Sequence, residues 1–138
     1  MNRVTFIILL ISCFSFIGFF IISAVIYKIN QKKMDKIIDL YMEKGFCLSS
    51  GAYIGHFMGI HGQIHPAVFF YKLLTGKRIR INRPDSKYMP QESYDFIQNL
   101  PSSLTHWMKT CIITTYIGGA LFFTATIIVL IQKHYSLY

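Results

Sequence analysis

Charged residues are scarce in this chain, and two long stretches lack them completely. Only 14% of the 138 residues are charged, compared with about 25% in an average soluble domain. Residues 4–27 and 110–131 contain no Asp, Glu, Lys or Arg. As helices that rise about 1.5 Å per residue, both stretches exceed the hydrocarbon core of a bilayer, which is about 30 Å thick. The sequence therefore argues against an ordinary soluble domain and predicts one transmembrane helix at each end.

Acidic residues and cysteines are also few, which limits the chemistry that the chain can perform. The sequence has six Asp and Glu residues and three cysteines, and it contains no phosphate-binding loop, paired carboxylates or recognisable catalytic signature. Cys13 and Cys111 fall within the predicted spans, so no disulfide framework is expected. Cys47 could act as a nucleophile with a histidine, but the sequence offers no orienting partner or oxyanion site. We therefore expect a non-enzymatic protein without a cofactor.

The positive charges predict how the chain is oriented. Of the fourteen Lys and Arg residues, only Arg3 precedes the first predicted span and only Lys133 follows the second. Because basic residues concentrate on the cytoplasmic side of a membrane, residues 28–109 are expected to be cytoplasmic and both termini periplasmic. Tyr27 and Trp107 lie near the span ends, where amphipathic rings favour the interface. The sequence thus predicts a multi-pass protein of the inner (cytoplasmic) membrane.

Two other topologies remain open from the sequence. A basic residue, Arg3, precedes the first span, as in a secretory signal, but the apolar core exceeds the usual length of about 7 to 15 residues and lysines follow it directly. Residues 46–71 carry no formal charge and are long enough for a third span. That crossing would place the basic residues after it outside and bury imidazoles in lipid. We expect this segment to lie at the interface or to pack on the ends of the spans instead, and whether it enters the membrane stays open.

An amphipathic helix is predicted directly after the first span. No helix breaker lies near Tyr27, so the transmembrane helix can continue into this segment, and Gly45 suits its end. Five apolar residues recur at the spacing of one helix face: Met34, Ile37, Ile38, Tyr41 and Met42.

The rest of the middle segment is predicted to form short elements. Pro66 and Gly76 suit the two ends of an apolar helix, and residues 91–100 suggest another helix that ends before Pro101. Residues 77–85 alternate between polar and apolar side chains, which indicates an extended stretch. The predicted fold class is therefore an all-α membrane protein, in which two terminal transmembrane helices flank a cytoplasmic segment of about 80 residues, with too few segments to build a large separate core.

The stretch GHFMGIHGQIHP, residues 55–66, combines glycines, histidines and apolar residues without formal charge. We predict an interfacial loop whose apolar side chains face lipid or a partner and whose imidazoles lie at headgroup level. The expected contacts are Phe57, Met58 and Ile60. A metal site is the alternative, but the acidic or cysteine partners typical of zinc sites are lacking. Its ligands would be His56, His61 and His65.

A basic run follows, and it needs either water or an anionic partner. Its members are Lys77, Arg78, Arg80 and Arg83. Near a cytoplasmic leaflet each such charge contributes about 1 kcal/mol of attraction to anionic lipid. A solvated face is the simpler interpretation. Nucleic acid is not expected, because the run is short and no helix for reading bases accompanies it.

Small and hydroxyl residues recur along both predicted spans, at a spacing that lets helices approach closely. The first span offers Ser12, Ser15, Gly18 and Ser23, and the second offers Thr114, Gly118 and Gly119. The two spans can therefore pack on each other. Alternatively, this face binds a second copy of the chain or another membrane protein.

The layout resembles that of universal stress protein B, a family of small inner-membrane proteins with a span at each end and a basic middle. The likeness rests on DLYMEKGF (39–46), a patch of glycines and aromatic residues, ESYDFI (92–97) and the terminal span. It implies a membrane accessory protein that binds another membrane component. Immunity proteins against membrane-active bacteriocins and phage superinfection-exclusion proteins share this size and character. The sequence leaves the partner and the oligomeric state open.

Overall fold

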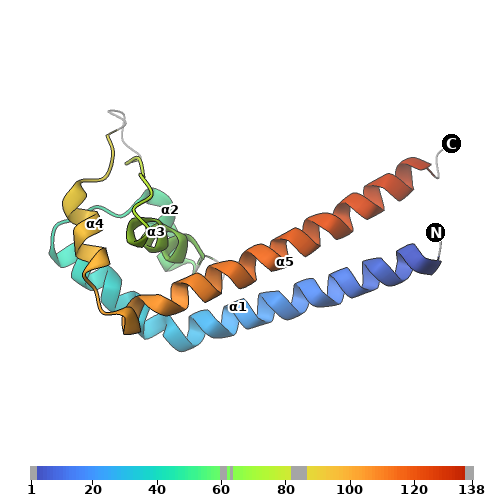
Figure 1. The fold of residues 1–138 in the computed structure, drawn as a ribbon, viewed down its shortest axis with the longest axis horizontal. Helices are drawn as coiled ribbons and strands as arrows, with labels where there is room; N and C mark the ends of the chain where they lie inside the picture. Colours follow the sequence, from blue (N-terminus) through green and yellow to red (C-terminus); the bar gives the residue numbers. More distant parts are fainter. Residues whose placement is uncertain (1–2, 60–61, 63, 82–86, 136–138) are drawn as a thin grey trace. The chain divides into compact units, whose positions relative to one another are not determined.

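The computed structural model describes residues 3–59, 62, 64–81 and 87–135, and this part of the chain is built from helices (Figure 1). In chain order they are α1 (Arg3–Glu43), α2 (Ser50–Phe57), α3 (Ile64–Leu74), α4 (Gln91–Gln98) and α5 (Ser102–Tyr135). No strand occurs among the described residues, apart from an isolated antiparallel bridge between Arg80 and Tyr88. The prediction of an all-α fold is confirmed at this level.

Helices α1 and α5 are both long and apolar enough to cross a membrane, as predicted. The most apolar stretch of 18 residues has a mean hydropathy of 2.7 in α1 and 1.9 in α5. Their large apolar side chains point outward, and Phe14 and Phe123 are 71% and 66% exposed. Helices α2 and α3 have 8 and 11 residues, whereas a span needs about 20. A third span over 46–71 therefore finds no matching helix among the described residues.

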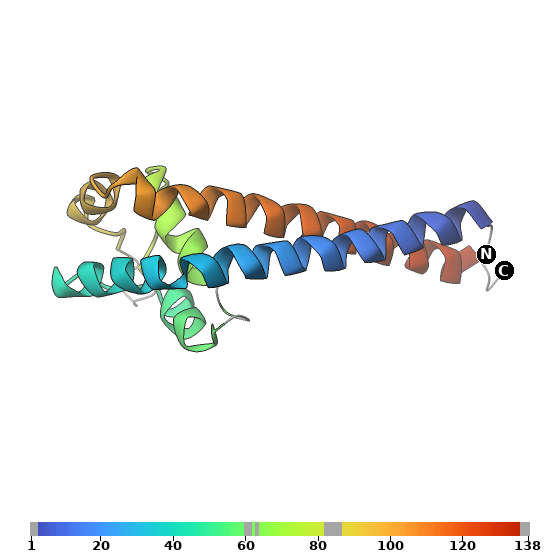
Figure 2. The ribbon, with the colours of Figure 1, turned by 90° about the horizontal axis from the view of Figure 1, so that it is seen from below.

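The chain divides into two compact units. Unit 1 comprises residues 1–24 and 113–138, and unit 2 comprises residues 25–112. Within unit 1 the segments of α1 and α5 lie side by side (Figure 2). The Ser23 and Thr115 hydroxyls form a hydrogen bond of 2.6 Å, and the rings of Phe16 and Phe122 lie 5.1 Å apart. Hydroxyl contacts and close packing are the interactions that hold helices together in lipid.

The small residues of unit 1 differ in what they contact. A Cβ atom at Gly118 would lie 3.3 Å from Cβ of Phe19, whereas at Gly18 and Gly119 it would meet nothing within 4 Å. Ser12 and Ser23 are buried, and Ser15 and Thr114 are partly buried. Gly118 thus allows the two segments to approach closely at this point. Gly18 and Gly119 have open space around them, and their packing role stays a prediction.

Gly118→Leu is expected to separate the two segments of unit 1, because the larger side chain collides with Phe16 and Phe19. The measurement is disulfide formation between Ser23→Cys and Thr115→Cys in membranes. We expect a severalfold loss of cross-linking in the Gly118→Leu background. Gly119→Leu is the matched control and should leave the yield unchanged. Equal yields from both variants would contradict the described packing.

Unit 2 has an aromatic core organised around Tyr41. Its ring lies 5.1 Å from Phe46, 5.3 Å from Phe70 and 6.3 Å from Phe96. Four members of the predicted apolar stripe are buried in this core: Met34, Ile37, Ile38 and Tyr41. The fifth, Met42, lies at the edge of this stripe and is 50% exposed. It lines a groove with Cys47 and Tyr53.

The predicted helix ends agree closely with the structure. Helix α1 runs without interruption to Glu43, and Gly45 and Gly76 follow α1 and α3 with φ of 77° and 70°. Glycine adopts this left-handed conformation without the penalty that a Cβ atom would bring. Helix α3 begins at Ile64, before the predicted start at Pro66.

The extended segment after Gly76 pairs with the residues before α4. The Ile81 N–H donates to the Lys87 carbonyl at 2.8 Å, and the Met89 N–H donates to the Ile79 carbonyl at 2.9 Å. The predicted extended stretch is therefore confirmed for residues 77–81, while residues 82–86 lie outside the described part. The pairing brings Tyr88 beside Arg80.

Candidate interaction surfaces

Helix α2 was not predicted, and it corrects the expectation that residues 55–66 form a loop. Residues 55–57 are the last turn of α2, and residues 64–66 belong to α3. The Ser49 hydroxyl caps α2 by accepting a hydrogen bond of 3.3 Å from the Ala52 N–H. The glycines do not prevent this helix, because packing against α3 stabilises it.

Two glycines allow α2 and α3 to meet at very short range. A Cβ atom on Gly55 would lie 2.6 Å from the Gly62 carbonyl oxygen and 2.8 Å from Cβ of His65. A Cβ atom on Gly62 would collide with the backbone of Gly55. Gly51, on the same helix, has open space around it. Only glycine therefore fits at positions 55 and 62, whereas Gly51 has room for a side chain.

A surface helix usually buries its large apolar side chains. Helix α2 does the reverse, because its small residues are buried and its large apolar residues are exposed. The buried residues of α2 are the small Ala52 and Gly55. The exposed residues are large and apolar, and we call them the α2 apolar face: Tyr53 (50% exposed), Ile54 (57%), Phe57 (71%) and Met58 (55%). The rings of Tyr53 and Phe57 lie 5.0 Å apart. A contiguous group of this kind marks a contact site more often than a solvated surface.

The structure places Phe57 and Met58 on this face, consistent with their predicted exposure. Ile60 lies outside the described residues, so its predicted contact is not tested. Tyr53 also lines the groove of about 370 Å³ beside Met42, so the apolar face continues into a concave surface.

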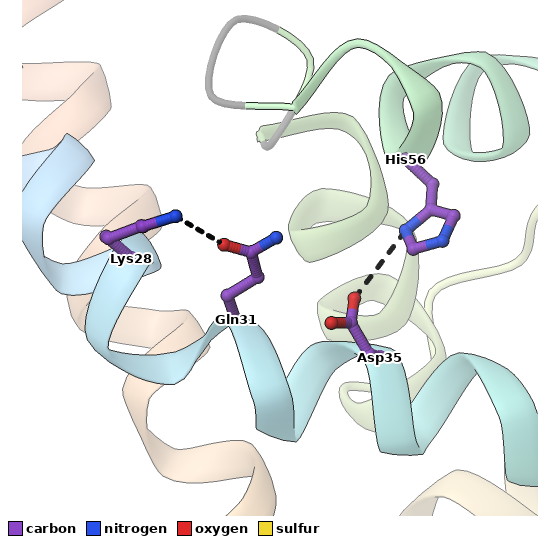
Figure 3. Close-up of polar contacts among 4 residues, drawn as sticks. All are labelled: Lys28, Gln31, Asp35 and His56. Atoms are coloured by element: carbon purple, nitrogen blue, oxygen red, sulfur yellow. Dashed lines mark hydrogen bonds and ion pairs between the residues drawn. The ribbon is translucent and has the colours of Figure 1, made fainter.

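The histidines are arranged differently from a metal site in the part that the structure describes. His56 points from α2 toward α1, and its Nδ1 atom lies 3.9 Å from Oδ1 of Asp35 (Figure 3). This distance permits an ion pair when the imidazole is protonated, but it is too long for a hydrogen bond. His65 is exposed, and His61 lies outside the described residues. No group of three metal-ligating side chains occurs among residues with a described placement.

Two basic residues of the predicted run converge on one tyrosine. The guanidinium carbons of Arg78 and Arg80 lie 5.7 and 5.5 Å from the centre of the Tyr88 ring, a distance typical of cation–π contacts. One Arg80 nitrogen also donates to the Tyr88 hydroxyl at 3.4 Å. We call this group the arginine pair. Lys77 is exposed beside it, and Arg83 lies outside the described residues.

The arginine pair creates a positive potential at Tyr88. The hydrogen bond and charge of Arg80, together with the charge of Arg78, lower the pKa of Tyr88 below its usual value of 10.0. Both effects stabilise the phenolate. This role of Tyr88 was not predicted from the sequence, because only the antiparallel pairing brings the residue to the arginines.

No family model, curated protein or solved structure matches this chain.

Proposed function

We propose that this chain is a small, non-enzymatic two-pass protein of the inner membrane that acts by binding another membrane component. In this proposal α1 and α5 supply the two spans, residues 28–109 are cytoplasmic, and both termini are periplasmic. Two observations support it: the length and apolar character of α1 and α5, and the concentration of basic residues between them. The role is of the accessory kind that the universal stress protein B layout implies.

The α2 apolar face is the observation that carries the interaction. A helix that buries glycine and alanine while exposing Tyr53, Ile54 and Phe57 leaves substantial apolar area in contact with water. Covering apolar area contributes about 25 cal/mol per Å². Tyrosine, phenylalanine and methionine are also enriched in the contacts of protein interfaces. The face therefore suits an apolar partner.

The position of α2 favours a protein as the partner of this face over lipid. Asp35, which His56 of α2 contacts, follows Tyr27 by eight residues of α1, or about 12 Å along the helix axis. If Tyr27 marks the end of the hydrocarbon core, the headgroup region extends only about 5 to 8 Å beyond it. The headgroup-level position expected for His56 does not fit this geometry. We therefore propose that the α2 apolar face binds another membrane protein. The contact would be an apolar surface of that protein at the point where it emerges from the bilayer.

Cross-linking in native membranes tests this function. A photoreactive benzoylphenylalanine in place of Phe57 should form a discrete adduct with a second protein, and Ile54→Asp should reduce the yield about tenfold by placing a charge inside the apolar contact. The same probe at Glu92, which is exposed on α4, is the matched control and should give no such adduct. Adducts with phospholipid alone, or equal protein adducts from both positions, would contradict the proposal.

A further inference from the structure

The arginine pair concentrates positive charge without a carboxylate to balance it in the described part of the chain. Arg78 and Arg80 are two residues apart in an extended segment, so their side chains project from the same side, and both contact the one Tyr88 ring. No ion pair to either guanidinium occurs among the described residues. The carboxylate of Asp95, on α4, accepts a hydrogen bond of 3.0 Å from the Gln91 side chain. Two guanidiniums beside one ring concentrate positive charge at one point of the surface, which attracts anions.

One member of the pair, Arg78, lines a groove together with the Tyr88 ring that both arginines contact. The groove has a volume of about 430 Å³, and its lining includes Arg78, Tyr88, Gln91 and Tyr94. The Tyr94 hydroxyl accepts from the Ile79 N–H at 2.9 Å and donates to the Lys77 carbonyl at 3.3 Å. These bonds attach the arginine-bearing segment to α4. The guanidinium groups therefore extend from a segment that is hydrogen-bonded to α4, and both of them pack on the Tyr88 ring.

We propose that the arginine pair and this groove form a binding site for a phosphate group. A guanidinium offers several donors in a planar fork that matches the oxygens of phosphate, and it binds such anions in bidentate fashion. Two guanidiniums suit a doubly charged group with three terminal oxygens better than a single carboxylate. Tyr88 and Gln91 supply further polar atoms at the rim. This site is separate from the α2 apolar face, so the proposal does not depend on that face.

The position of the groove favours a water-soluble phosphate over a lipid headgroup. Tyr94 and Phe96 belong to the same helix, and Phe96 packs on Tyr41 at 6.3 Å. Tyr41 follows Tyr27 by 14 residues of α1, or about 21 Å along the axis, and the usual tilt of about 20° shortens this little. That distance exceeds the headgroup thickness and the Debye length of about 8 Å. This assignment of the source rests on the membrane placement proposed above, whereas the phosphate site itself does not.

A titration of the full-length protein with inorganic phosphate tests the site. The protein is held in uncharged detergent with ¹³C-labelled tyrosine rings, and the Tyr88 signal reports binding by nuclear magnetic resonance. We expect a saturable shift, together with a rise of the Tyr88 pKa, because the bound anion offsets the charge of the arginines. Arg78→Lys with Arg80→Lys keeps the charge but removes the forks, and it should weaken binding about tenfold.

The controls distinguish specific binding at this site from nonspecific attraction to a basic surface. Lys32→Gln with Lys36→Gln removes two exposed charges of α1 and should leave phosphate binding unchanged. Nanodiscs with and without phosphatidylglycerol distinguish the two sources, and equal phosphate affinity in both supports a soluble one. If phosphatidylglycerol competes with phosphate, the phosphate site is supported, but the claim that its ligand is a water-soluble phosphate is overturned. The absence of a saturable shift, or equal affinity in the double-lysine variant, would overturn the site.

Discussion

Gly55→Ala is expected to destabilise unit 2 by about 1 to 3 kcal/mol, because it overpacks the contact between α2 and α3. The new methyl group would lie 2.6 Å from the Gly62 carbonyl oxygen and 2.8 Å from Cβ of His65. Neither is the end of a flexible side chain, so the two helices must move apart. The measurement is the free energy of unfolding of the full-length protein in detergent, followed by the fluorescence of Trp107.

The matched control for this prediction is Gly51→Ala on the same helix. Nothing lies within 4 Å of a Cβ atom there, and alanine exceeds glycine in helix propensity by about 1 kcal/mol. Gly51→Ala should therefore be neutral or stabilising. If both substitutions had the same sign and size, helix propensity alone would explain them, and the close approach of α2 and α3 would be wrong.

Tyr41→Ala is expected to cost about 3 to 5 kcal/mol, as for other large aromatic side chains removed from a core. The ring is fully buried and packs on phenylalanines at 46, 69, 70 and 96. Its loss leaves a cavity that α1, α3 and α4 cannot all close. Tyr41→Phe keeps the ring and should change the free energy of unfolding by less than about 1 kcal/mol. Equal losses from both variants would contradict the central role of the ring.

The hydroxyl of Tyr41 gives unit 2 a sensitivity to alkaline pH. Burial raises the pKa of Tyr41 from 10.0 to about 12. The unfolded chain therefore loses this proton at a lower pH than the folded chain, so the stabilising contribution is complete below pH 10.0 and declines as the pH rises toward about 12. Between these values the wild type should lose more stability than Tyr41→Phe. Parallel loss of stability in the two proteins would show that other groups cause it.

The sequence predicted the elements whose signals are local. Long uncharged runs mark α1 and α5 because lipid contact requires consecutive apolar residues. The stripe from Met34 to Tyr41 marks the C-terminal part of α1 because its period is that of a helix. Gly45 and Gly76 marked helix ends, since their positive φ angles are conformations that glycine adopts readily. These features depend on neighbours along the chain and not on the final packing.

The candidate surfaces depend on contacts that the sequence does not display. Gly55 and Gly62 looked like loop residues, and only the approach of α3 explains why α2 exposes its large side chains. Phe57 and Met58 were identified from composition, but their place on a helix was not. Tyr88 joins Arg78 and Arg80 through antiparallel pairing, and a pattern of alternating residues does not specify its partner strand.

Labelling of Cys47 in intact spheroplasts tests most directly whether unit 2 lies on the cytoplasmic side of a membrane that the chain crosses twice. Cys47 is exposed in unit 2, and Cys13→Ser with Cys111→Ala leaves it as the one reporter thiol. A membrane-impermeant maleimide should leave Cys47 unmodified until the membrane is opened, whereas Asn2→Cys, in a variant that also carries Cys47→Ser, should react in intact spheroplasts. Modification of Cys47 before the membrane is opened would contradict the topology and the interaction proposed from it.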